Sequence, residues 1–194
     1  MELTQLDSDV QRLMESLGQL GEPVVNPAFI AVSGLPGTGK SYFSSKLAEG
    51  LSIIVLESDA LRKILSPSPS YSLAESARLF RAIHLLIERL LKKGISVLLD
   101  ATNLSEWNRE RLYNIADRLN IRLILVRVEA PPAVVQERLK ARQEGLYQGK
   151  SDASWEIYQR MKPTVQKIRR NHYVVDTSKD VTPVLNKIVR EVSK

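Results

Sequence analysis

Residues 34–41 read Gly34-Leu35-Pro36-Gly37-Thr38-Gly39-Lys40-Ser41, and this stretch decides how the rest of the sequence is interpreted. It fits the P-loop pattern of a glycine, four residues, a second glycine, a lysine and a serine or threonine. The glycines let backbone N–H groups turn onto phosphate oxygens, the start of the next helix favours the same anions, and the lysine adds a mobile positive charge. The hydroxyl group of Ser41 is placed to coordinate Mg²⁺. The stretch therefore predicts binding of a nucleoside triphosphate.

The flanking sequence supports this interpretation of the loop. An apolar run, Phe29 to Ser33, precedes it, and a helical pattern, Ser41 to Gly50, follows it. A strand, a glycine loop and a helix in this order form the context that the P-loop mechanism requires. The residues assigned to nucleotide binding are Gly34, Gly37, Thr38, Gly39, Lys40, Ser41 and Tyr42.

Apolar runs alternate with helical patterns along the whole chain. Helical patterns lie between the runs and also fill residues 153–170, with an interruption at Pro163. Right-handed crossovers should then place helices on both faces of one sheet. The sequence predicts an α/β fold of three αβα layers, with an open, mainly parallel five-stranded sheet and a helical lid. The runs typical of buried strands are residues 29–33, 53–56, 95–99, 121–128 and 174–175.

Connectors suggest how the chain is divided. Apolar residues at helical spacing predict an amphipathic helix at residues 7–20, and a connector with glycine and two prolines follows it. We therefore divide the chain into an N-terminal helical extension with its connector, residues 1–26, and a P-loop domain, residues 27–194. Within the domain, a lid is expected at about residues 138–152.

Length, composition and charge limit the classes of protein to which the chain can belong. A length of 194 residues with 43% hydrophobic residues suits one compact core, and the absence of cysteine excludes disulfides and thiolate metal sites. The net charge of +6 is spread along the chain, so it does not separate a nucleic-acid partner from a phosphate-binding pocket. No apolar stretch of about 18 residues occurs, and the N-terminus is acidic. We expect a cytoplasmic protein with no membrane partner, as a monomer or a weak dimer.

Several classes of nucleotide-driven protein lack their signatures in this chain. A GTPase would show Asn-Lys-x-Asp, whereas the chain has Asn186-Lys187-Ile188-Val189. A transporter-type ATPase would show Ser-Gly-Gly, which does not occur in the sequence. ATP hydrolases often end a strand in paired acids, but alanine follows Asp100. These absences favour a phosphotransferase over a switch or a motor.

Polar side chains follow the second and third predicted strands. Asp59 lies in Glu57-Ser58-Asp59-Ala60-Leu61-Arg62, directly after the second, and Asp100 begins Asp100-Ala101-Thr102-Asn103 at the end of the third. Ligands of an open parallel sheet bind at the carboxyl ends of its strands, so both acids should lie near the P-loop. Arg138 and Arg142 lie four residues apart on one helix face, where they can close over phosphates as a lid.

This combination resembles a family of P-loop kinases that includes polynucleotide 5′-hydroxyl kinases, gluconate and chloramphenicol kinases and related bacterial ATP-binding kinases. The resemblance spans about residues 28–192 and rests on the P-loop, the Asp-x-x-Arg and Asp-x-Thr-Asn stretches after two strands, and the lid arginines. It implies that Asp59 is the acceptor-side base, that Arg62 contacts the acceptor or its phosphate, and that Asp100 lies near Mg²⁺.

Several residues are assigned to each functional role, namely catalysis, acceptor binding and metal binding. For Arg109, a solvated helix face is the alternative to a site role. The residues assigned to catalysis are Lys40, Asp59, Arg138 and Arg142. Those assigned to the acceptor are Asp59, Arg62, Thr102, Asn103 and Arg109, and those assigned to the metal are Ser41 and Asp100.

The sequence thus predicts a kinase that uses ATP and Mg²⁺ and transfers the γ-phosphoryl group to a hydroxyl group of a small molecule. Two alternatives stay open: a polynucleotide 5′-hydroxyl kinase, and a regulatory ATP-binding or ATPase module without an acceptor. A nucleic-acid acceptor is not favoured, because no Asp-x-Asp-Gly-Thr phosphatase signature occurs and residues 151–170 resemble the bacterial members more than the nucleic-acid enzymes.

Overall fold

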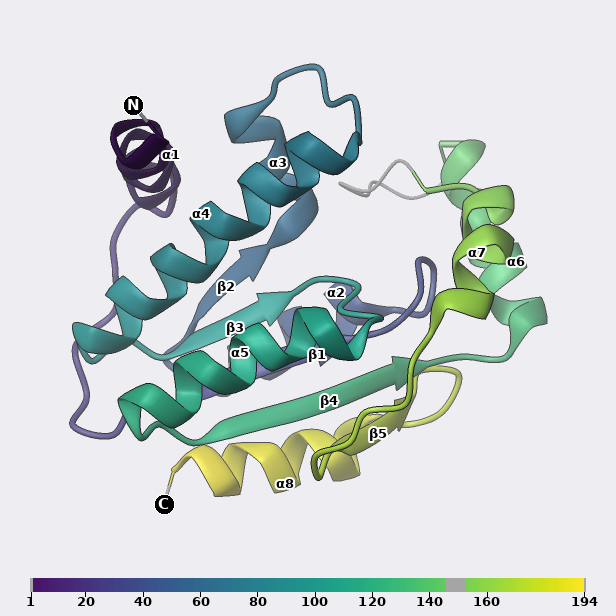
Figure 1. Ribbon diagram of the computed structural model, residues 1–194. Helices are drawn as coiled ribbons and strands as arrows, with labels where there is room; N and C mark the ends of the chain where they lie inside the picture. The colour runs from purple at the N-terminus through teal and green to yellow at the C-terminus, as the bar shows by residue number, and fades with distance from the viewer. Residues whose placement is uncertain (1, 146–152, 194) are drawn as a thin grey trace.

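The chain folds around a five-stranded parallel sheet, which this computed structural model describes over residues 2–145 and 153–193. The strand order is β2-β3-β1-β4-β5, and every pair of neighbours runs parallel (Figure 1). Each strand coincides with one of the predicted apolar runs to within a few residues, so the predicted α/β fold is confirmed. The strands are β1 (Phe29–Ser33), β2 (Ile54–Glu57), β3 (Val97–Asp100), β4 (Leu123–Glu129) and β5 (Tyr173–Asp176).

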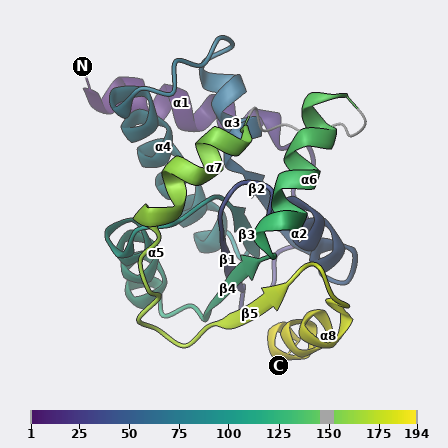
Figure 2. The same ribbon diagram turned by 90° about the vertical axis from the view of Figure 1, so that its right-hand side faces the viewer.

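Helices cover both faces of this sheet, and two more stand beyond the ends of its strands (Figures 1 and 2). One face carries α1 (Glu2–Ser16), α3 (Ser58–Leu65), α4 (Leu73–Lys92) and α5 (Glu106–Leu119). The other face carries α2 (Lys40–Glu49) and α8 (Thr182–Val192). The two helices beyond the strand ends are α6 (Pro132–Gln143) and α7 (Trp155–Met161). The arrangement forms the three predicted αβα layers.

Strand β1 is buried on both faces, which explains its unbroken apolar run. Phe29 and Ala31 belong to the core under α4 and α5, whereas Ile30 and Val32 belong to the core under α2 and α8. Successive side chains of a strand point to opposite faces, so a strand between two helical layers needs apolar residues at every position. Full burial of one large aliphatic or aromatic side chain contributes about 1.5–3 kcal/mol. This central strand therefore gives the P-loop a rigid starting point.

Helix α1 begins and ends earlier than the predicted span of residues 7–20. Val10 and Leu13 are fully buried in the core shared with α4. The buried carboxylate of Asp9 accepts two hydrogen bonds, each 2.6 Å long, from the guanidinium of Arg78 in α4. These bonds hold the pKa of Asp9 below its ordinary value. Helix α1 is thus tied to α4, and the division of the chain into an extension and a domain stays a prediction.

The segment after α7 differs from the sequence-based expectation. The helices predicted through residues 153–170 are wrong beyond α7, because only one turn of 3-10 helix, Lys162–Thr164, follows before the chain loses helical structure. Pro163 supplies no N–H group to a helix. The N–H group of Gln166 instead donates to the carbonyl oxygen of Leu104 at 2.9 Å. A long-range contact therefore replaces the helical hydrogen bond at this position.

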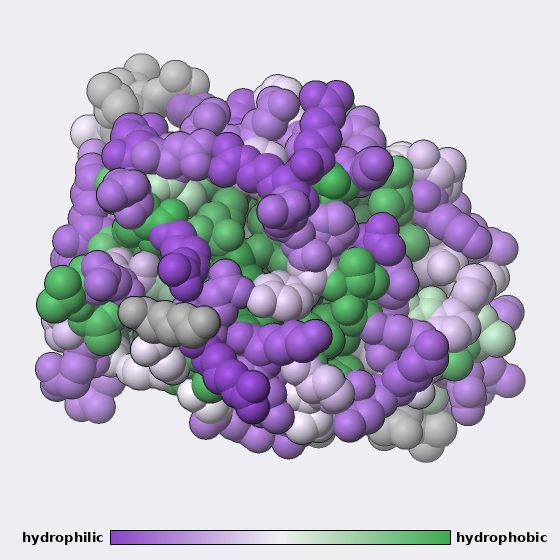
Figure 3. Space-filling view, turned by 90° about the horizontal axis from the view of Figure 1, so that it is seen from below, coloured by the Kyte–Doolittle hydropathy of each residue, from purple (hydrophilic) through white to green (hydrophobic). Residues whose placement is uncertain are grey.

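Hydrophilic side chains cover most of the face that is seen from below in Figure 3. None of the described helices is long and apolar enough to cross a membrane. Seen from below, where α8 lies in Figure 1, hydrophilic side chains surround recessed apolar ones (Figure 3). In α8, Ile188 is fully buried against the sheet, while Lys187 and Arg190 are exposed. This pattern is typical of an amphipathic helix that covers one face of a sheet.

His84 of α4 makes the stability of the fold depend on pH. Its ring packs beside Phe80, with 6.2 Å between the ring centroids. Burial lowers the pKa of His84 from 6.5 to about 4, and the positive charge of Arg111 adds to this effect. Between these two values the unfolded chain binds more protons than the folded chain. The contribution of this group to stability is therefore complete above pH 6.5 and is lost as the pH falls toward 4.

We expect His84→Gln to remove part of the loss of stability in acid. The free energy of unfolding of the unchanged protein should fall by at most about 3 kcal/mol between neutral pH and pH 4 because of this histidine. Urea denaturation at several pH values measures the effect, and His172→Gln is the matched control. Equal pH slopes for the two variants would contradict the assignment.

Candidate active site

A pocket of about 1140 Å³ opens at the carboxyl ends of the strands. These strand ends face the viewer in Figure 2. The P-loop, the first turn of α2, the ends of β2 and β3, helix α6 and the turn after β5 form its walls. Segments that are far apart in the chain meet here, as expected for ligand sites of open parallel sheets. The lining includes ten of the residues assigned from the sequence: Gly37, Gly39, Lys40, Ser41, Tyr42, Asp59, Asp100, Thr102, Arg138 and Arg142.

Close packing against other segments favours glycine in the P-loop, as Gly39 and Gly34 show. Gly39 has a φ of +89°, and a Cβ atom there would lie 2.8 Å from the hydroxyl oxygen of Thr177. A Cβ atom on Gly34 would lie 2.3 Å from the carbonyl oxygen of Val128. Helix α2 begins at Lys40, directly after Gly39. The first N–H groups of this helix therefore lie at the pocket, where they can bind an anion.

Lys40 and Asp100 form the charged centre of the pocket. The Lys40 ammonium group donates to the carbonyl oxygen of Leu35 in its own loop, at 3.1 Å. Burial lowers the pKa of Lys40, while the nearby carboxylates of Asp100 and Asp59 oppose this shift. Burial also raises the pKa of Asp100, and Lys40 and the Ser41 hydroxyl oppose that shift. Each charge of the pair is thus stabilised by the other.

The residues around Asp100 fit a magnesium ion that is shared with a nucleotide. The Oδ2 atom of Asp100 is buried and has no hydrogen-bond partner in the part of the chain that the structure describes, although most buried polar atoms have one. Mg²⁺ takes one or two protein oxygens together with phosphate oxygens and water. Ser41 and Asp100 offer that donor set. Over residues 2–145 and 153–193, no group of three or more His, Cys, Asp or Glu side chains could hold a metal by itself.

Among the described residues, five that were assigned to the site lie outside the pocket lining: Gly34, Thr38, Arg62, Asn103 and Arg109. Three of them shape the loops instead. The N–H group of Gly34 donates to the carbonyl oxygen of Thr102 at 3.0 Å, and the Thr38 hydroxyl donates to a carbonyl of the P-loop at 2.8 Å. The side-chain amide of Asn103 donates to the carbonyl oxygen of Val32 at 2.9 Å. The bonds of Gly34 and Asn103 hold the loop after β3 against the end of β1, and the bond of Thr38 lies within the P-loop.

Thr177 and Lys179 also line the pocket, although neither was predicted from the sequence. The Thr177 hydroxyl donates to the carbonyl oxygen of Thr38 at 2.6 Å and accepts from Nη1 of Arg138 at 2.7 Å. Nη2 of Arg138 donates to the Thr177 carbonyl at 2.9 Å. Thr177 therefore joins the P-loop to the lid arginine. The sequence does contain a pattern that indicates Thr177. Polar residues 176–179 follow the last predicted strand, just as Asp-containing stretches follow the second and third predicted strands.

Apolar contacts hold helix α6, which contains residues 138–143 of the predicted lid, over the P-loop. Val135 and Leu139 are fully buried and form a cluster with Tyr158 of α7. A Cβ atom on Gly37 would lie 2.8 Å from Val135 Cγ1 and 2.9 Å from Leu139 Cγ. Residues 146–152 of the predicted lid lie outside the described residues. The P-loop and the arginine helix thus pack as one unit.

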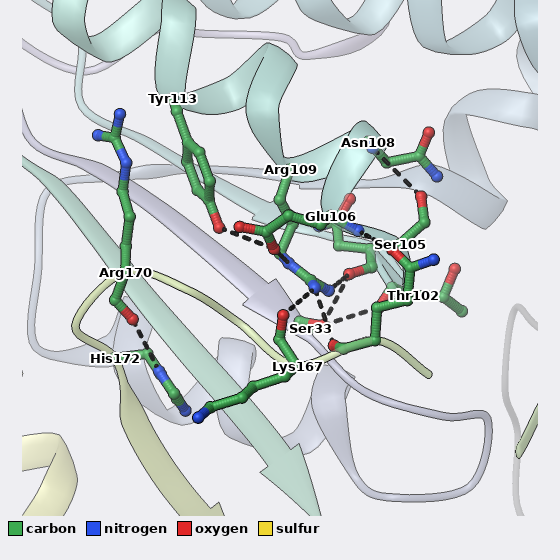
Figure 4. Close-up of polar contacts among 12 residues, drawn as sticks. Ser33, Thr102, Ser105, Glu106, Asn108, Arg109, Tyr113, Lys167, Arg170 and His172 are labelled. Carbon is green, nitrogen blue, oxygen red and sulfur yellow. Dashed lines mark hydrogen bonds and ion pairs between the residues drawn. The ribbon is translucent and has the colours of Figure 1, made fainter. Parts of the chain in front are cut away.

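Arg109 lies in the interior and not at the pocket. It is 1% exposed, and its guanidinium donates to Oε2 of Glu106 at 2.8 Å (Figure 4). It also donates to the carbonyl oxygens of Asn103, Gln166 and Lys167, at 2.6, 2.8 and 3.1 Å. These bonds join the loop after β3 to the chain after α7. The alternative of a solvated helix face is wrong, and the position gives no support to the predicted acceptor contact.

We expect Arg109→Met to lower the free energy of unfolding by about 3–5 kcal/mol, because it leaves the Glu106 carboxylate buried without its cation. Arg118→Met, on the same helix, is the matched control. The Arg118 side chain is 58% exposed and pairs with Glu88 at the surface, so its loss should cost about 1 kcal/mol or less. Urea denaturation measures both values, and equal losses would contradict a structural role for Arg109.

Comparison with known proteins agrees with this geometry. A family described as an AAA domain matches residues 29–176, from the first residue of β1 to the last residue of β5. The chain belongs to this AAA domain family. The part of the chain that matches the AAA domain contains the P-loop, both acid-bearing strand ends and the arginines of α6.

Relatives of this AAA domain include kinases. An adenylyl-sulfate kinase of Deinococcus deserti is 35% identical over an alignment of 112 residues, and the match covers 55% of this chain. The chain matches 59% of that relative's own length. Kti12 from Chaetomium thermophilum, solved with ADP-AlF3, has a TM-score of 0.67 at 19% identity, over 84% of this chain and 98% of that one. A gluconokinase from Sinorhizobium meliloti has a TM-score of 0.61 at 19% identity, over 86% and 92%. The resemblance to P-loop kinases is thereby confirmed.

Proposed function

We propose that this protein is a kinase that uses ATP and Mg²⁺ and transfers the γ-phosphoryl group to a hydroxyl group of a small molecule. One observation carries the proposal: the P-loop and the carboxylate of Asp59 line the same pocket. A nucleotide-driven switch has no need of a carboxylate that can accept a hydroxyl proton, whereas a kinase does. The kinases among the relatives support the same conclusion.

In the proposed reaction, the acceptor oxygen attacks the γ-phosphorus atom of ATP. A new P–O bond forms, the bond to the oxygen that bridges the β- and γ-phosphorus atoms breaks, and ADP leaves. The hydroxyl proton passes to Asp59. Because the transition state is loose, the main task of Asp59 is to orient the hydroxyl group. Lys40, Arg138 and Arg142 stabilise the charge that develops on phosphate oxygens.

Ser41 and Asp100 would hold the magnesium ion. A magnesium ion held there would supply positive charge that offsets the negative charge of the nucleotide phosphates. The unpartnered Oδ2 atom of Asp100 supports this assignment, as does the position of Ser41 in the first turn of α2.

Arg142→Ala should lower kcat by about 10–10³-fold and change ATP affinity less, since the side chain acts mainly on charge that develops during transfer. Arg142 lines the pocket, whereas Lys140 on the same helix does not and has a side chain that is 75% exposed. Lys140→Ala is therefore the matched control. Steady-state kinetics and ATP titration separate the two effects. Full turnover in a folded Arg142→Ala variant would show that Arg142 is only a cation on the helix surface and has no catalytic role.

Acceptor-dependent release of ADP tests the proposed function. A hexitol, a sugar acid, an aminoglycoside, a nucleoside and a 5′-hydroxyl oligonucleotide would each be added to the protein with ATP and Mg²⁺. Stimulation by a small molecule, with a phosphorylated product detected by mass spectrometry, supports the proposal. Stimulation by the oligonucleotide alone would favour a polynucleotide kinase. ATP turnover that no acceptor changes would favour a regulatory module.

A further inference from the structure

Thr177 is held in place by bonds to β4 and to the P-loop and by a hydrogen-bonded turn. Its N–H group donates to the carbonyl oxygen of Glu129, the last residue of β4, at 3.0 Å. Its hydroxyl group donates to the carbonyl oxygen of Thr38 at 2.6 Å. In the turn that follows β5, Oδ1 of Asp176 accepts from the N–H and hydroxyl groups of Ser178, at 3.0 and 2.6 Å. Thr177 is also buried, so it forms a firm support for a neighbouring side chain.

Arg138 is bound to Thr177 through two nitrogen atoms of its guanidinium. Nη1 donates to the Thr177 hydroxyl at 2.7 Å, and Nη2 donates to the Thr177 carbonyl at 2.9 Å. A guanidinium has five N–H donors in one plane, so two bonds to one residue fix the orientation of that plane and leave other donors for a ligand. Arg138 lines the pocket. Protein groups thus set the direction in which this cation faces the nucleotide site.

The two neighbours of the Thr177 hydroxyl fix the position of its proton. The carbonyl group of Thr38 can only accept a hydrogen bond, and the guanidinium of Arg138 can only donate one. The proton of the hydroxyl therefore points to the P-loop, and a lone pair of its oxygen faces Arg138. Valine matches the branched shape of threonine but would break both bonds, whereas serine would keep both.

Both ends of Arg138 are attached to the P-loop. Its backbone belongs to α6, in which Val135 and Leu139 are fully buried beside Gly37. Its guanidinium is joined to the P-loop through Thr177. Fixing a long side chain costs conformational entropy, and contacts within the protein have already fixed this one. A nucleotide that binds Arg138 therefore does not bear that cost.

We propose that Thr177 is a positioning residue of the nucleotide site, which holds the guanidinium of Arg138 in the orientation that binds ATP. This inference rests on the proposed use of ATP and adds a residue to the proposed machinery. The AAA domain family matches residues 29–176, so Thr177 lies just beyond the matched part of the chain. Because the protein fixes Arg138, this arginine contributes to ATP binding itself, whereas Arg142 is expected to act mainly during transfer.

Titration with a non-hydrolysable ATP analogue and Mg²⁺ tests the inference without any acceptor. We expect Thr177→Val to raise the dissociation constant about three- to tenfold, and Thr177→Ser to restore it to within about twofold of the unchanged protein. Thr164→Val is the matched control, because the Thr164 hydroxyl is exposed, donates to the Met161 carbonyl at 2.7 Å and lies outside the pocket lining. Melting temperatures show whether each variant is folded.

A double-mutant cycle separates positioning of Arg138 from a general structural role. Once Arg138→Ala has removed the side chain that Thr177 orients, adding Thr177→Val should weaken binding by less than about twofold. An equal loss in both backgrounds would show that Thr177 acts through the P-loop alone and would overturn the inference. Unchanged affinity in a folded Thr177→Val protein would overturn it too.

The acceptor panel decides the proposed function separately. If no compound in that panel is phosphorylated but the cycle shows coupling, the kinase assignment fails and the role of Thr177 stands. If the unchanged protein does not bind the ATP analogue, both fail.

Nuclear magnetic resonance of the unchanged protein covers the case in which Thr177→Val does not fold. The Nε–H signal of Arg138 is assigned by its loss in Arg138→Lys. We expect its order parameter to exceed about 0.6 without nucleotide and to change little when the ATP analogue is added. A lower value without nucleotide would show that Thr177 does not fix the guanidinium, and it would overturn the inference.

Discussion

Replacing Lys40 with alanine is expected to lower phosphoryl transfer on the order of 10²–10³-fold and to weaken ATP binding. The Lys40 side chain is the cation that the P-loop itself contributes, and its ammonium group lies beside Asp100 and Asp59. Removing it also takes away the charge that opposes the raised pKa of Asp100, so this carboxyl becomes harder to ionise. The loss of the Lys40 charge and the weaker ionisation of Asp100 both reduce the stabilisation of the ATP phosphates. ATP titration and initial rates of acceptor phosphorylation measure them.

Lys46→Ala is the matched control for this prediction. Lys46 also belongs to α2, but its side chain is 45% exposed and pairs with Glu49 at 3.1 Å on the surface. Its removal should change neither ATP affinity nor transfer. Melting temperatures of both variants show whether each is folded. Unchanged ATP affinity and unchanged transfer in a folded Lys40→Ala protein would contradict the phosphate-binding role assigned to the P-loop.

The fold was predictable because its strands are buried on both faces. In β1, four successive side chains divide between two cores, so the strand reads as an unbroken apolar run. Helix α3 gave no such signal, since it is only eight residues long and starts directly after β2. The chain after α7 is the opposite case, because its sequence predicts a helix that the structure does not have. Residues 165–170 have helix-compatible composition, but bonds to Leu104 and Arg109 hold their backbone out of a helix.

Parts of the site could be predicted wherever position along the chain fixes position in space. Asp59, Asp100 and the P-loop all follow strands of one parallel sheet, so their meeting at one edge follows from topology. The partners of Arg62 and Arg109 do not follow from topology. Arg62 pairs with a carboxylate 13 residues away, and Arg109 donates to a carbonyl 57 residues away. Such pairings depend on how helices pack, which residue spacing alone does not specify.

Asp59→Asn is expected to reduce phosphoryl transfer on the order of 10²–10⁴-fold while ATP binding survives. Asparagine keeps the size and the hydrogen-bonding reach of the side chain but cannot accept the hydroxyl proton. Arg62 does not require Asp59 as a structural partner, because its guanidinium is bound by Glu75 and Ser76. The melting temperature should therefore change little, which separates a catalytic loss from a loss of folding.

Asp117→Asn provides the comparison for this variant. Asp117 has a side chain that is 57% exposed and binds Arg170 at 2.6 Å, outside the pocket lining. It should keep full transfer and full ATP affinity. Measuring ATP affinity, melting temperature and acceptor phosphorylation on one preparation of each variant gives the decisive set. If Asp59→Asn lowered stability while its folded fraction kept normal specific activity, Asp59 would be a structural residue, and the base would have to be sought among the other carboxylates at the ends of β2 and β3.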